Sequence, residues 1–319
     1  MIYTVTLNTA VDRILHINGE LTRKHNNKIQ NAHFDIGGKA THVSVVLSSL
    51  SIENIAMGFI GSINKDVLVH LLEAKGVKCD FIEQESCSIR ESLVLIDESG
   101  KGSYMITEKG FPIENKTYEK LLAKLKSTIK ENDIVIFAGS PPEGIDGEKY
   151  KRILEIIKEQ KGKVIIDATG EYLKAAIPLK PMMIKPNEFE FQELIGKSLN
   201  TLADYVREIH GLLESGIEYV VVSLGRKGSL VGHQHRIYQV SPPNITEVND
   251  TGCGDVFVGG IIAKLSQNSS LEDTFRFATA LSASKATHWG SSDFSLVQAK
   301  ELEPEVQIKL IGRDEYVVL

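Results

Sequence analysis

Short, continuous apolar strands alternate with helical segments along most of this sequence, and this alternation limits the possible folds more than any other feature. Val- and Ile-rich runs lie at 133–137, 163–167 and 219–224, and helical segments lie between them at 149–159 and 202–213. A continuous apolar run predicts a strand buried on both faces, because a strand with one exposed face alternates apolar and polar residues. We therefore predict an α/β fold with a mostly parallel central sheet that is covered by helices.

Two segments interrupt this alternation because they have strand patterns with almost no helix between them. Residues 26–34 and 91–107 alternate apolar and polar side chains, and the second segment contains a turn at 98–102. We interpret them as a small β-lid, formed by about 12–36 and 90–110, across the mouth of the main sheet.

The lid strands have no helix of their own to cover their apolar side chains. An exposed apolar sheet face is a liability that a symmetric partner can bury. We therefore predict a two-fold homodimer joined through the lids. The side chains that would form this interface are Ile29, Leu93, Leu95, Tyr104 and Ile106.

The composition is that of a globular protein of 319 residues, 42% hydrophobic and 24% charged, and we expect one domain spanning 1–319. A net charge of -6 without a basic tract argues against nucleic acid as a partner. No apolar run is long enough to span a membrane, and the N-terminus lacks the pattern of a signal peptide. Cys79, Cys87 and Cys253 have no metal-like spacing and are odd in number, so we expect a reducing, cytoplasmic compartment.

A glycine-rich turn near the C-terminus carries the strongest chemical signal: Asn249-Asp250-Thr251-Gly252-Cys253-Gly254-Asp255, followed by an apolar helix. Glycines let the backbone approach a ligand closely, and the helix N-terminus behind them offers unpaired N–H groups to an anion. A carboxylate beside such a cradle suits a general base that activates a hydroxyl for attack on a phosphate. Asp255 is therefore the candidate catalytic residue. The alternative is a structural turn in which Asp255 only stabilises the first turn of the helix.

A second glycine-rich turn, Gly37-Gly38-Lys39, opens an apolar, helix-like stretch near the N-terminus. Upstream of it, the strand predicted at 2–7 leads to Asp12, which we place at the C-terminal end of that strand. A carboxylate in this position, beside the Gly-Gly-Lys turn, can bind sugar hydroxyls. The chain therefore has two anion-friendly turns, one suited to the phosphates of a donor and the other to an acceptor.

These motifs resemble, in order along nearly the whole chain, the signatures of the ribokinase-like carbohydrate kinases, also called the PfkB family. The opening segment and the Gly-Gly-Lys turn are similar to those of its phosphosugar branch, which holds 1-phosphofructokinase and tagatose-6-phosphate kinase. The resemblance implies a three-layer α/β/α ribokinase-like fold. It also implies ATP- and Mg²⁺-dependent phosphorylation of a ketohexose phosphate, with fructose 1-phosphate or tagatose 6-phosphate as the acceptor. The segments that carry it are Thr6-Leu7-Asn8-Thr9-Ala10-Val11-Asp12, Gly37-Gly38-Lys39, Ile184-Lys185-Pro186-Asn187-Glu188-Phe189-Glu190, Val221-Val222-Ser223-Leu224-Gly225-Arg226-Lys227-Gly228 and the turn that ends at Asp255.

The resemblance also implies a role for each matched residue. Asp255 would be the general base, and the backbone N–H groups of Gly252, Cys253 and Gly254 would form an anion hole. Cys253 stands where the family commonly has Ala, so we interpret its side chain as a small filler rather than a nucleophile. Lys39 would pair with the acceptor's own phosphate or with the γ-phosphate. The acceptor-binding residues it implies are Asp12, Gly37, Gly38, Lys39, His42, Arg90, Ser140 and Lys28. The nucleotide-binding residues it implies are Lys185, Asn187, Ser223, Gly225, Gly228 and Ser284.

Asn187 and Glu190 are a candidate Mg²⁺ site on the helix predicted after Pro186. Their spacing of three residues puts both side chains on one face of that helix. One carboxylate with a nearby amide, acting through water, suits Mg²⁺, which keeps several of its waters. The same spacing is that of a capping box, and both interpretations can hold together.

Three positions depart from the phosphosugar pattern: Thr9 replaces Pro, Ala40 replaces the third Gly and His42 replaces Asn. We place all three in the acceptor half of the site, so phosphoryl transfer stays expected while the acceptor is left open. An unphosphorylated sugar or a nucleoside is the alternative acceptor, and a non-catalytic sugar-phosphate sensor is the alternative to an enzyme. Asp255 and its glycines argue against the sensor, because a pure binding protein has no use for a base.

Overall fold

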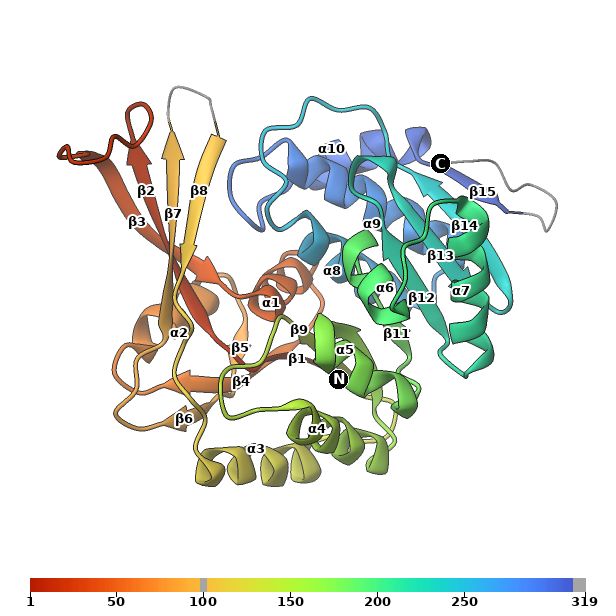
Figure 1. Ribbon diagram of the computed structural model, residues 1–319, viewed down its shortest axis with the longest axis horizontal. Helices are drawn as coiled ribbons and strands as arrows, with labels where there is room; N and C mark the ends of the chain where they lie inside the picture. The colour runs from red at the N-terminus through yellow and green to blue at the C-terminus, as the bar shows by residue number, and fades with distance from the viewer. Residues whose placement is uncertain (98–101, 312–319) are drawn as a thin grey trace.

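The computed structural model describes residues 1–97 and 102–311, and its main body is a large sheet between two layers of helices (Figure 1). Within this sheet β12, β11, β10, β9, β1, β4 and β5 lie side by side in that order and pair in parallel. β13, β14 and β15 extend the sheet beyond β12 in antiparallel fashion. The predicted α/β class and mostly parallel sheet are thus confirmed. In spatial order the strands are β15 (Gln307–Leu310), β14 (Arg236–Ser241), β13 (Ser229–His233), β12 (Tyr219–Ser223), β11 (Met183–Ile184), β10 (Lys163–Asp167), β9 (Ile134–Ala138), β1 (Ile2–Thr6), β4 (Ile55–Gly61) and β5 (Lys78–Cys79), with β6 (Ile82–Gln84) paired to β4.

Helices cover both faces of this sheet, which explains why its central strands are continuously apolar. Side chains that alternate along β9 enter different cores, with Val135 and Phe137 in one and Ile136 in the other. The first core is closed by α3 (Asn115–Thr128), α4 (Gly147–Glu159), α5 (Gly170–Ala176), α6 (Glu188–Ile195) and α7 (Leu202–Glu214). The opposite face is closed by α1 (Lys39–Ser49), α2 (Lys65–Ala74), α8 (Cys253–Ser266) and α9 (Leu271–Ala286), with α10 (Leu296–Leu302) packed on α9.

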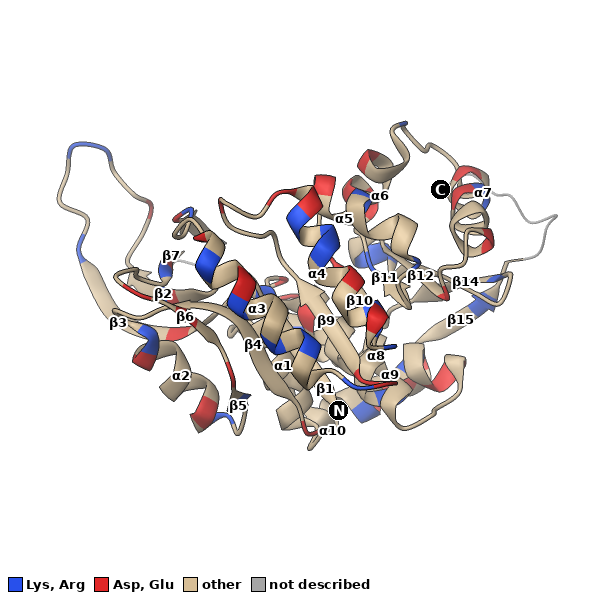
Figure 2. Ribbon diagram, turned by 90° about the horizontal axis from the view of Figure 1, so that it is seen from below, with Lys and Arg blue, Asp and Glu red and all other residues tan. Residues whose placement is uncertain are grey.

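Charged residues recur along α3 and α4 in Figure 2, and none of the buried residues of these two helices is charged, so their outer sides are polar. On α4, Arg152 forms ion pairs with Glu155 and Glu159 along this exposed side. Three short 3₁₀ turns complete the helical segments: η1 (Ile177–Leu179), η2 (Gly225–Lys227) and η3 (Glu303–Glu305). Among the residues described, no helix is both long and apolar enough to cross a membrane.

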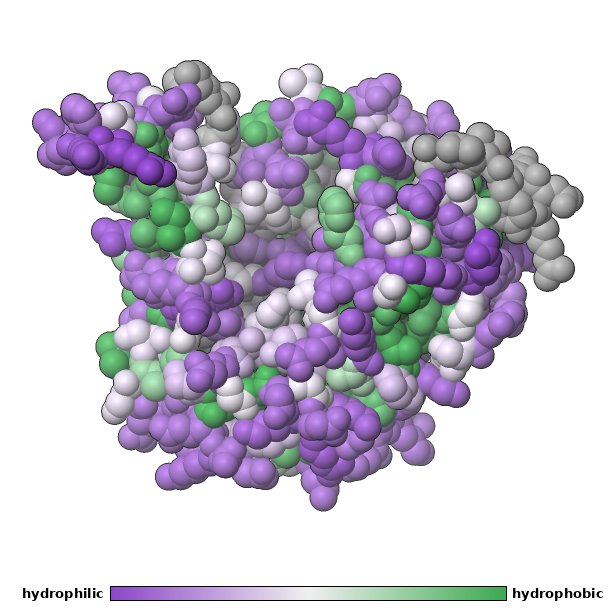
Figure 3. Space-filling model, in the orientation of Figure 1, coloured by the Kyte–Doolittle hydropathy of each residue, from purple (hydrophilic) through white to green (hydrophobic). Residues whose placement is uncertain are grey.

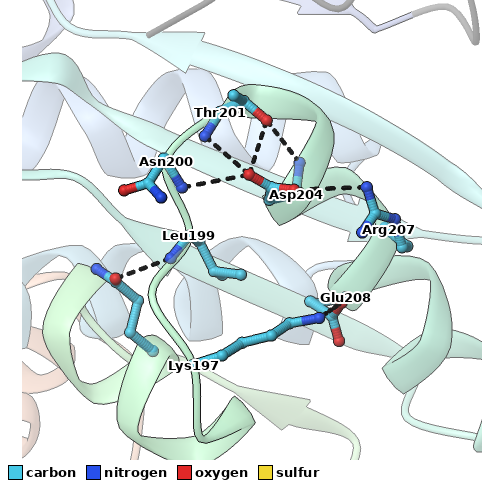
Figure 4. Close-up of polar contacts among 8 residues, drawn as sticks. Lys197, Leu199, Asn200, Thr201, Asp204, Arg207 and Glu208 are labelled. Atoms are coloured by element: carbon cyan, nitrogen blue, oxygen red, sulfur yellow. Dashed lines mark hydrogen bonds and ion pairs between the residues drawn. The ribbon is translucent and has the colours of Figure 1, made fainter.

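Local sequence signals fix several helix starts, and α7 is the clearest example (Figure 4). The Thr201 hydroxyl accepts a hydrogen bond from the Asp204 backbone N–H at 3.2 Å, and the Asp204 carboxylate accepts one from the Thr201 N–H at 3.1 Å. This reciprocal capping satisfies N–H groups that a helix start leaves unpaired. The helix begins at Leu202, where the sequence pattern predicted it.

A second sheet of four strands stands beside the main body, on the left in Figure 1. Its order is β3 (Ile29–Gly37), β2 (Ala10–Ile17), β7 (Arg90–Asp97) and β8 (Gly102–Thr107), and we refer to it as the lid. The predicted turn at 98–102 lies almost wholly outside the described residues. One sequence prediction here was wrong: Asp12 is not at the end of the first strand but inside β2, the strand that follows.

The strand register separates the lid into two faces of different character. One row of paired residues holds Asp12 of β2 and Ser92 of β7. The next row, which points to the opposite face, holds Phe34, Arg13, Leu93 and Ile106, so it is apolar except for Arg13. The face with Asp12 points toward the main body, so the apolar face lies outside. In Figure 3 apolar residues gather on the lid, and the surface is hollowed between the lid and the main body.

Candidate active site

The carboxyl ends of the parallel strands meet at the edge of the sheet that lies nearest the lid. Gly139 follows β9, Asp167 ends β10, Lys185 follows β11, and the turn at Gly252 opens α8. Loops at this edge of a parallel sheet are the usual place for a ligand in α/β proteins. The two glycine-rich turns singled out in the sequence therefore lie at the same edge. They are far apart in the chain, since His42 after the first turn and Asp255 in the second are 213 positions apart.

The turn before α8 has a left-handed backbone at Gly252, where any residue with a side chain would be strained and would clash. Gly252 caps the helix with φ 82°, and a Cβ there would lie 1.8 Å from the Ser291 carbonyl oxygen. The Cys253 N–H donates to the Asp250 carbonyl at 3.1 Å, which leaves it bonded within the turn. In the described part of the chain, the N–H groups of Gly252 and Gly254 donate to no protein acceptor. Those two groups, rather than all three predicted, are open to an anion in this geometry.

Asp255 and His42 form a buried pair that joins α8 to α1. His42 Nδ1 lies 2.9 Å from Asp255 Oδ2, and His42 Nε2 lies 2.8 Å from the Ile36 carbonyl oxygen. Burial on its own lowers the pKa of His42, but the hydrogen bond to Asp255 and its charge outweigh this and raise the pKa to about 9. With both ring nitrogens engaged, the geometry argues against the predicted contact of His42 with the acceptor. The sequence analysis placed Thr9, Ala40 and His42 in the acceptor half of the site. For His42 this placement was wrong, because its side chain contacts Asp255.

Asp12 and Arg90 lie together on adjacent lid strands. Burial raises the pKa of Asp12 to about 6, although the nearby charges of His42 and Arg90 lower it. Gly37, which pairs with Ala10, leaves room for the Asp12 side chain, because a Cβ on Gly37 would lie 2.4 Å from Asp12 Oδ1. The Arg90 guanidinium donates to the carbonyls of Glu108 and Asn8 at 3.3 and 3.4 Å. A carboxylate and a guanidinium are thus held side by side, a combination suited to hydroxyls and to a phosphate.

Two lysines converge on Asp167, a residue that the sequence analysis treated only as the end of a strand. Lys39 Nζ and Lys185 Nζ lie 3.8 and 3.3 Å from Asp167 Oδ1. The charge of Asp167 raises the pKa of Lys39. Lys185 Nζ also lies 3.7 Å from the position of a Cβ on Gly254, so its ammonium lies beside the turn at 249–255, which we call the anion turn. Both oxygens of the buried Asp167 carboxylate lack a hydrogen-bond partner in the described part of the chain, which leaves them able to orient the two ammonium groups.

The departures Thr9 and Ala40 are accommodated without strain. The Thr9 hydroxyl donates to the Phe59 carbonyl at 2.9 Å, so the residue that replaces Pro is buried and satisfied. Ala40 is a fully buried residue in the first turn of α1 and is absent from the residues with positive φ. Neither change therefore distorts the Gly37–Gly38–Lys39 turn.

The predicted metal pair forms the capping box that the sequence also allowed. Asn187 Oδ1 accepts from the Glu190 N–H at 2.9 Å, and one carboxylate oxygen of Glu190, Oε2, accepts from the Asn187 N–H at 2.8 Å. The other oxygen of Glu190 remains for a hydrated Mg²⁺, whereas the Asn187 carbonyl is already engaged. The described residues contain no group of three His, Cys, Asp or Glu side chains that could hold a metal ion directly. The donor set therefore fits Mg²⁺ held largely through water and substrate oxygens.

The other nucleotide-side residues occupy the ends of β12 and α9. Ser223 ends β12 and its N–H donates to the Pro186 carbonyl at 3.0 Å, which ties it to the Asn187 segment. Gly225 opens a 3₁₀ turn, and Gly228 closes it with φ 93°, where a Cβ would lie 1.9 Å from the Val240 carbonyl oxygen. Ser284 is fully buried, and its hydroxyl lies 3.1 Å from the Ser295 carbonyl and 2.7 Å from Gln298 Oε1. This packing argues against the predicted contact of Ser284 with adenine.

The two remaining acceptor candidates, Ser140 and Lys28, lie in different parts of the molecule. Ser140 is exposed just after β9, with its hydroxyl 3.4 Å from that of Thr169, so it stands at the sheet edge where the site is built. Lys28 precedes Ile29, at the opposite end of β3 from Gly37. Asp12 pairs with Asp35 of β3, which is seven residues from Lys28, a separation of roughly 23 Å at about 3.3 Å per residue. Lys28 is therefore too far along the lid to reach the acceptor beside Asp12 of its own chain.

Lys285 is a further residue at this site that the sequence analysis did not identify. It is fully buried, and its ammonium donates to the carbonyls of Asn249 and His288 at 2.9 and 3.2 Å. Burial lowers its pKa. The contact holds the start of the anion turn against the end of α9, and its only sequence signal is a lysine within a largely apolar helix. Burial also raises the pKa of Cys253 to about 11, which supports its interpretation as a filler rather than a nucleophile.

Known proteins resemble this chain in sequence and in fold. The family model described as "pfkB family carbohydrate kinase" matches residues 5–298. A 1-phosphofructokinase of Bacillus subtilis is 30% identical over 97% of this chain and 99% of the relative. A tagatose-6-phosphate kinase of Staphylococcus epidermidis is 29% identical over 97% of this chain and 99% of the relative. The crystal structure of phosphofructokinase-2 from Escherichia coli in complex with potassium is similar with a TM-score of 0.90, at 25% identity, covering 95% of this chain and 98% of that one.

Proposed function

Because this chain belongs to the pfkB family of carbohydrate kinases, whose members phosphorylate a sugar hydroxyl with ATP, we propose that its acceptor is a ketohexose phosphate and its product a bisphosphate. Fructose 1-phosphate and tagatose 6-phosphate are the acceptors we infer, and the names of the relatives support both. The observation that carries the proposal is the position of Asp255 in the first turn of α8, directly after Gly252 and Gly254 and bonded to His42, whose ring also faces Asp12 of the lid.

In the proposed reaction each charged group has a separate task. The acceptor hydroxyl oxygen forms a bond to the γ-phosphorus, and its proton passes to Asp255. The bond between that phosphorus and the bridging oxygen breaks, and its electron pair leaves with ADP. The free N–H groups of Gly252 and Gly254 and the ammonium of Lys185 stabilise the charge on the transferred group.

The acceptor would be bound by the lid on one side and by the sheet edge on the other. Asp12 accepts hydrogen bonds from sugar hydroxyls, while Arg90 and Lys39 bind the phosphate that the sugar already carries. Ser140 adds a hydroxyl from the sheet edge. Glu190 would hold Mg²⁺ through water, and that ion would supply charge neutralisation between the β- and γ-phosphates.

The same proposal includes a dimer and a compartment. The outer lid face exposes Ile29, Phe34, Tyr104 and Ile106, each between 45% and 54%, which supports a homodimer joined through the lids. Leu95 is buried within the lid itself and Leu93 is partly so, which makes the exposed patch smaller than predicted. Free thiols at all three cysteines support a reducing, cytoplasmic compartment.

The test is an assay of ADP release with a panel of sugars and sugar phosphates. Asp255→Asn should lower kcat by several orders of magnitude and leave ATP binding nearly unchanged, because a positioned base acts mainly in the transition state. The best acceptor in the panel should carry a phosphate. A folded Asp255→Asn protein with most of its turnover would refute the assignment of the base, and a best acceptor without phosphate would refute the phosphosugar assignment.

A further inference from the structure

The hydrogen bonds of His42 determine where its protons are. The Ile36 carbonyl oxygen only accepts hydrogen bonds, so the contact at 2.8 Å requires a proton on Nε2. A neutral ring would then present the Nδ1 lone pair to the Asp255 carboxylate, only 2.9 Å away. Two lone pairs at this distance repel, so the contact contains a proton. The raised pKa of His42 places that proton on the ring, and the pair is an imidazolium beside a carboxylate.

The two carboxylate oxygens of Asp255 differ in their hydrogen bonds. Oδ2 accepts the hydrogen bond from His42, whereas Oδ1 makes no hydrogen bond in the described part of the chain. The Asp255 side chain is 8% exposed, so its second oxygen is held in place rather than free to rotate in water. A base that is fixed in this way presents one defined atom to the acceptor.

We propose that His42 is a positioning residue for Asp255, whose charged Nδ1–H fixes Oδ2 so that Oδ1 takes the proton of the acceptor hydroxyl. This inference rests on the proposed role of Asp255 as the general base. It gives the replacement of Asn by His a function in phosphoryl transfer rather than in the choice of acceptor. His42 touches no reacting atom, because both its nitrogens are engaged within the protein.

The inference predicts how the rate depends on pH. The charged groups that face the ring are Asp255 on α8 and Asp12 on β2, while β3 contributes only the neutral Ile36 carbonyl. Both carboxylates favour the imidazolium, which explains a pKa of about 9 in spite of burial. As the pH rises through about 9, His42 loses its proton, its lone pair faces Oδ2, and kcat should fall.

Two variants separate the contacts of His42. In His42→Asn the amide N–H₂ takes the place of Nδ1 and keeps a neutral donor toward Asp255. In His42→Gln the amide reaches the position of Nε2 and keeps only the contact with Ile36. We expect His42→Gln to lower kcat by about ten-fold or more with the KM for ATP nearly unchanged, and His42→Asn to lower it less. In both variants the fall in kcat near pH 9 should disappear, because neither side chain titrates there.

Asp255→Asn in the same assay distinguishes the possible failures. If Asp255→Asn retains its turnover, the proposed function fails and this inference fails with it. If Asp255→Asn is inactive while both His42 variants keep the kcat and pH profile of the unmodified protein, only the inference about His42 is overturned. Should either variant fail to fold, nitrogen NMR of histidine in the unmodified protein decides the question. A ring protonated on both nitrogens at neutral pH supports the inference, and a neutral ring overturns it.

Discussion

Replacement of Gly252 by alanine tests the geometry of the anion turn more directly than any other single change. Gly252 has φ 82°, a left-handed conformation that costs a residue with a Cβ about 1–2 kcal/mol. The new methyl group would also lie 1.8 Å from the Ser291 carbonyl oxygen, whereas an ordinary contact begins at 3.4 Å. The Ser291 segment or the turn must therefore move by the difference of about 1.6 Å.

The expected loss of stability is the sum of the backbone strain and the steric clash. Overpacking of this kind typically costs about 1–3 kcal/mol, so the sum with the backbone strain is about 2–5 kcal/mol. If the protein relieves this strain by displacing the turn, the N–H groups of Gly252 and Gly254 no longer point at the transferred phosphate. Because loss of one such donor typically lowers kcat by about 10²–10³, we expect kcat to fall by about 100-fold or more in addition to the loss of stability.

A matched control separates the clash from the backbone strain. Gly196 has φ 78°, nearly the same backbone conformation, but a Cβ there would meet no atom within 4 Å. Gly196→Ala should therefore lose about 1–2 kcal/mol of stability in thermal or denaturant unfolding and keep its kcat. A Gly252→Ala enzyme with kcat close to that of the unmodified protein would refute this reasoning, as would an equal loss of kcat in Gly196→Ala.

Three further predictions concern the acceptor and the assembly. Arg90→Ala should raise the KM for the sugar phosphate by about ten-fold or more in steady-state kinetics, because a charge-assisted contact is lost, while Arg207→Ala on the exposed side of α7 should not. The KM for the acceptor should rise as the pH falls through about 6, where Asp12 takes up a proton, and Asp12→Asn should abolish this dependence. Ile106→Glu should shift the protein to a monomer in sedimentation velocity, whereas Val297→Glu, an exposed apolar position on α10, should leave it a dimer.

The central strands could be predicted because burial on both faces leaves a local signal. The strand at 163–167 was predicted at its observed bounds, and those at 133–137 and 219–224 within one residue. The antiparallel strands β13, β14 and β15 were missed, because their short, mixed sequences pair only through neighbours that the pattern does not reveal. β2 was missed for a different reason: only three residues separate it from β1, so the two strands read as one strand and a turn.

The geometry of the candidate site could be predicted where it depends only on residues within one motif. The left-handed Gly252 and the free N–H groups of Gly252 and Gly254 are local properties of the turn, and so is the capping box of Asn187 and Glu190. The contacts of Asp167 with Lys39 and Lys185 depend on three separate strands or turns, and no spacing in the sequence encodes them. Lys285 was missed because a buried lysine that binds backbone carbonyls leaves no partner side chain to detect.

The contact between His42 and Asp255 depends on a glycine outside the active site. A glycine inside a helix costs about 0.5–1 kcal/mol relative to alanine, so Gly259 in the middle of α8 requires a structural reason. A Cβ on Gly259 would lie 2.5 Å from Val46 Cγ1 on α1. Val46 lies one helical turn after His42, just as Gly259 lies one turn after Asp255, so the two pairs are successive contacts along one helix interface. The missing side chain lets α1 and α8 approach closely enough for Nδ1 and Oδ2 to meet at 2.9 Å, and the proposed base is thus positioned by packing that the glycine-rich turns do not contain.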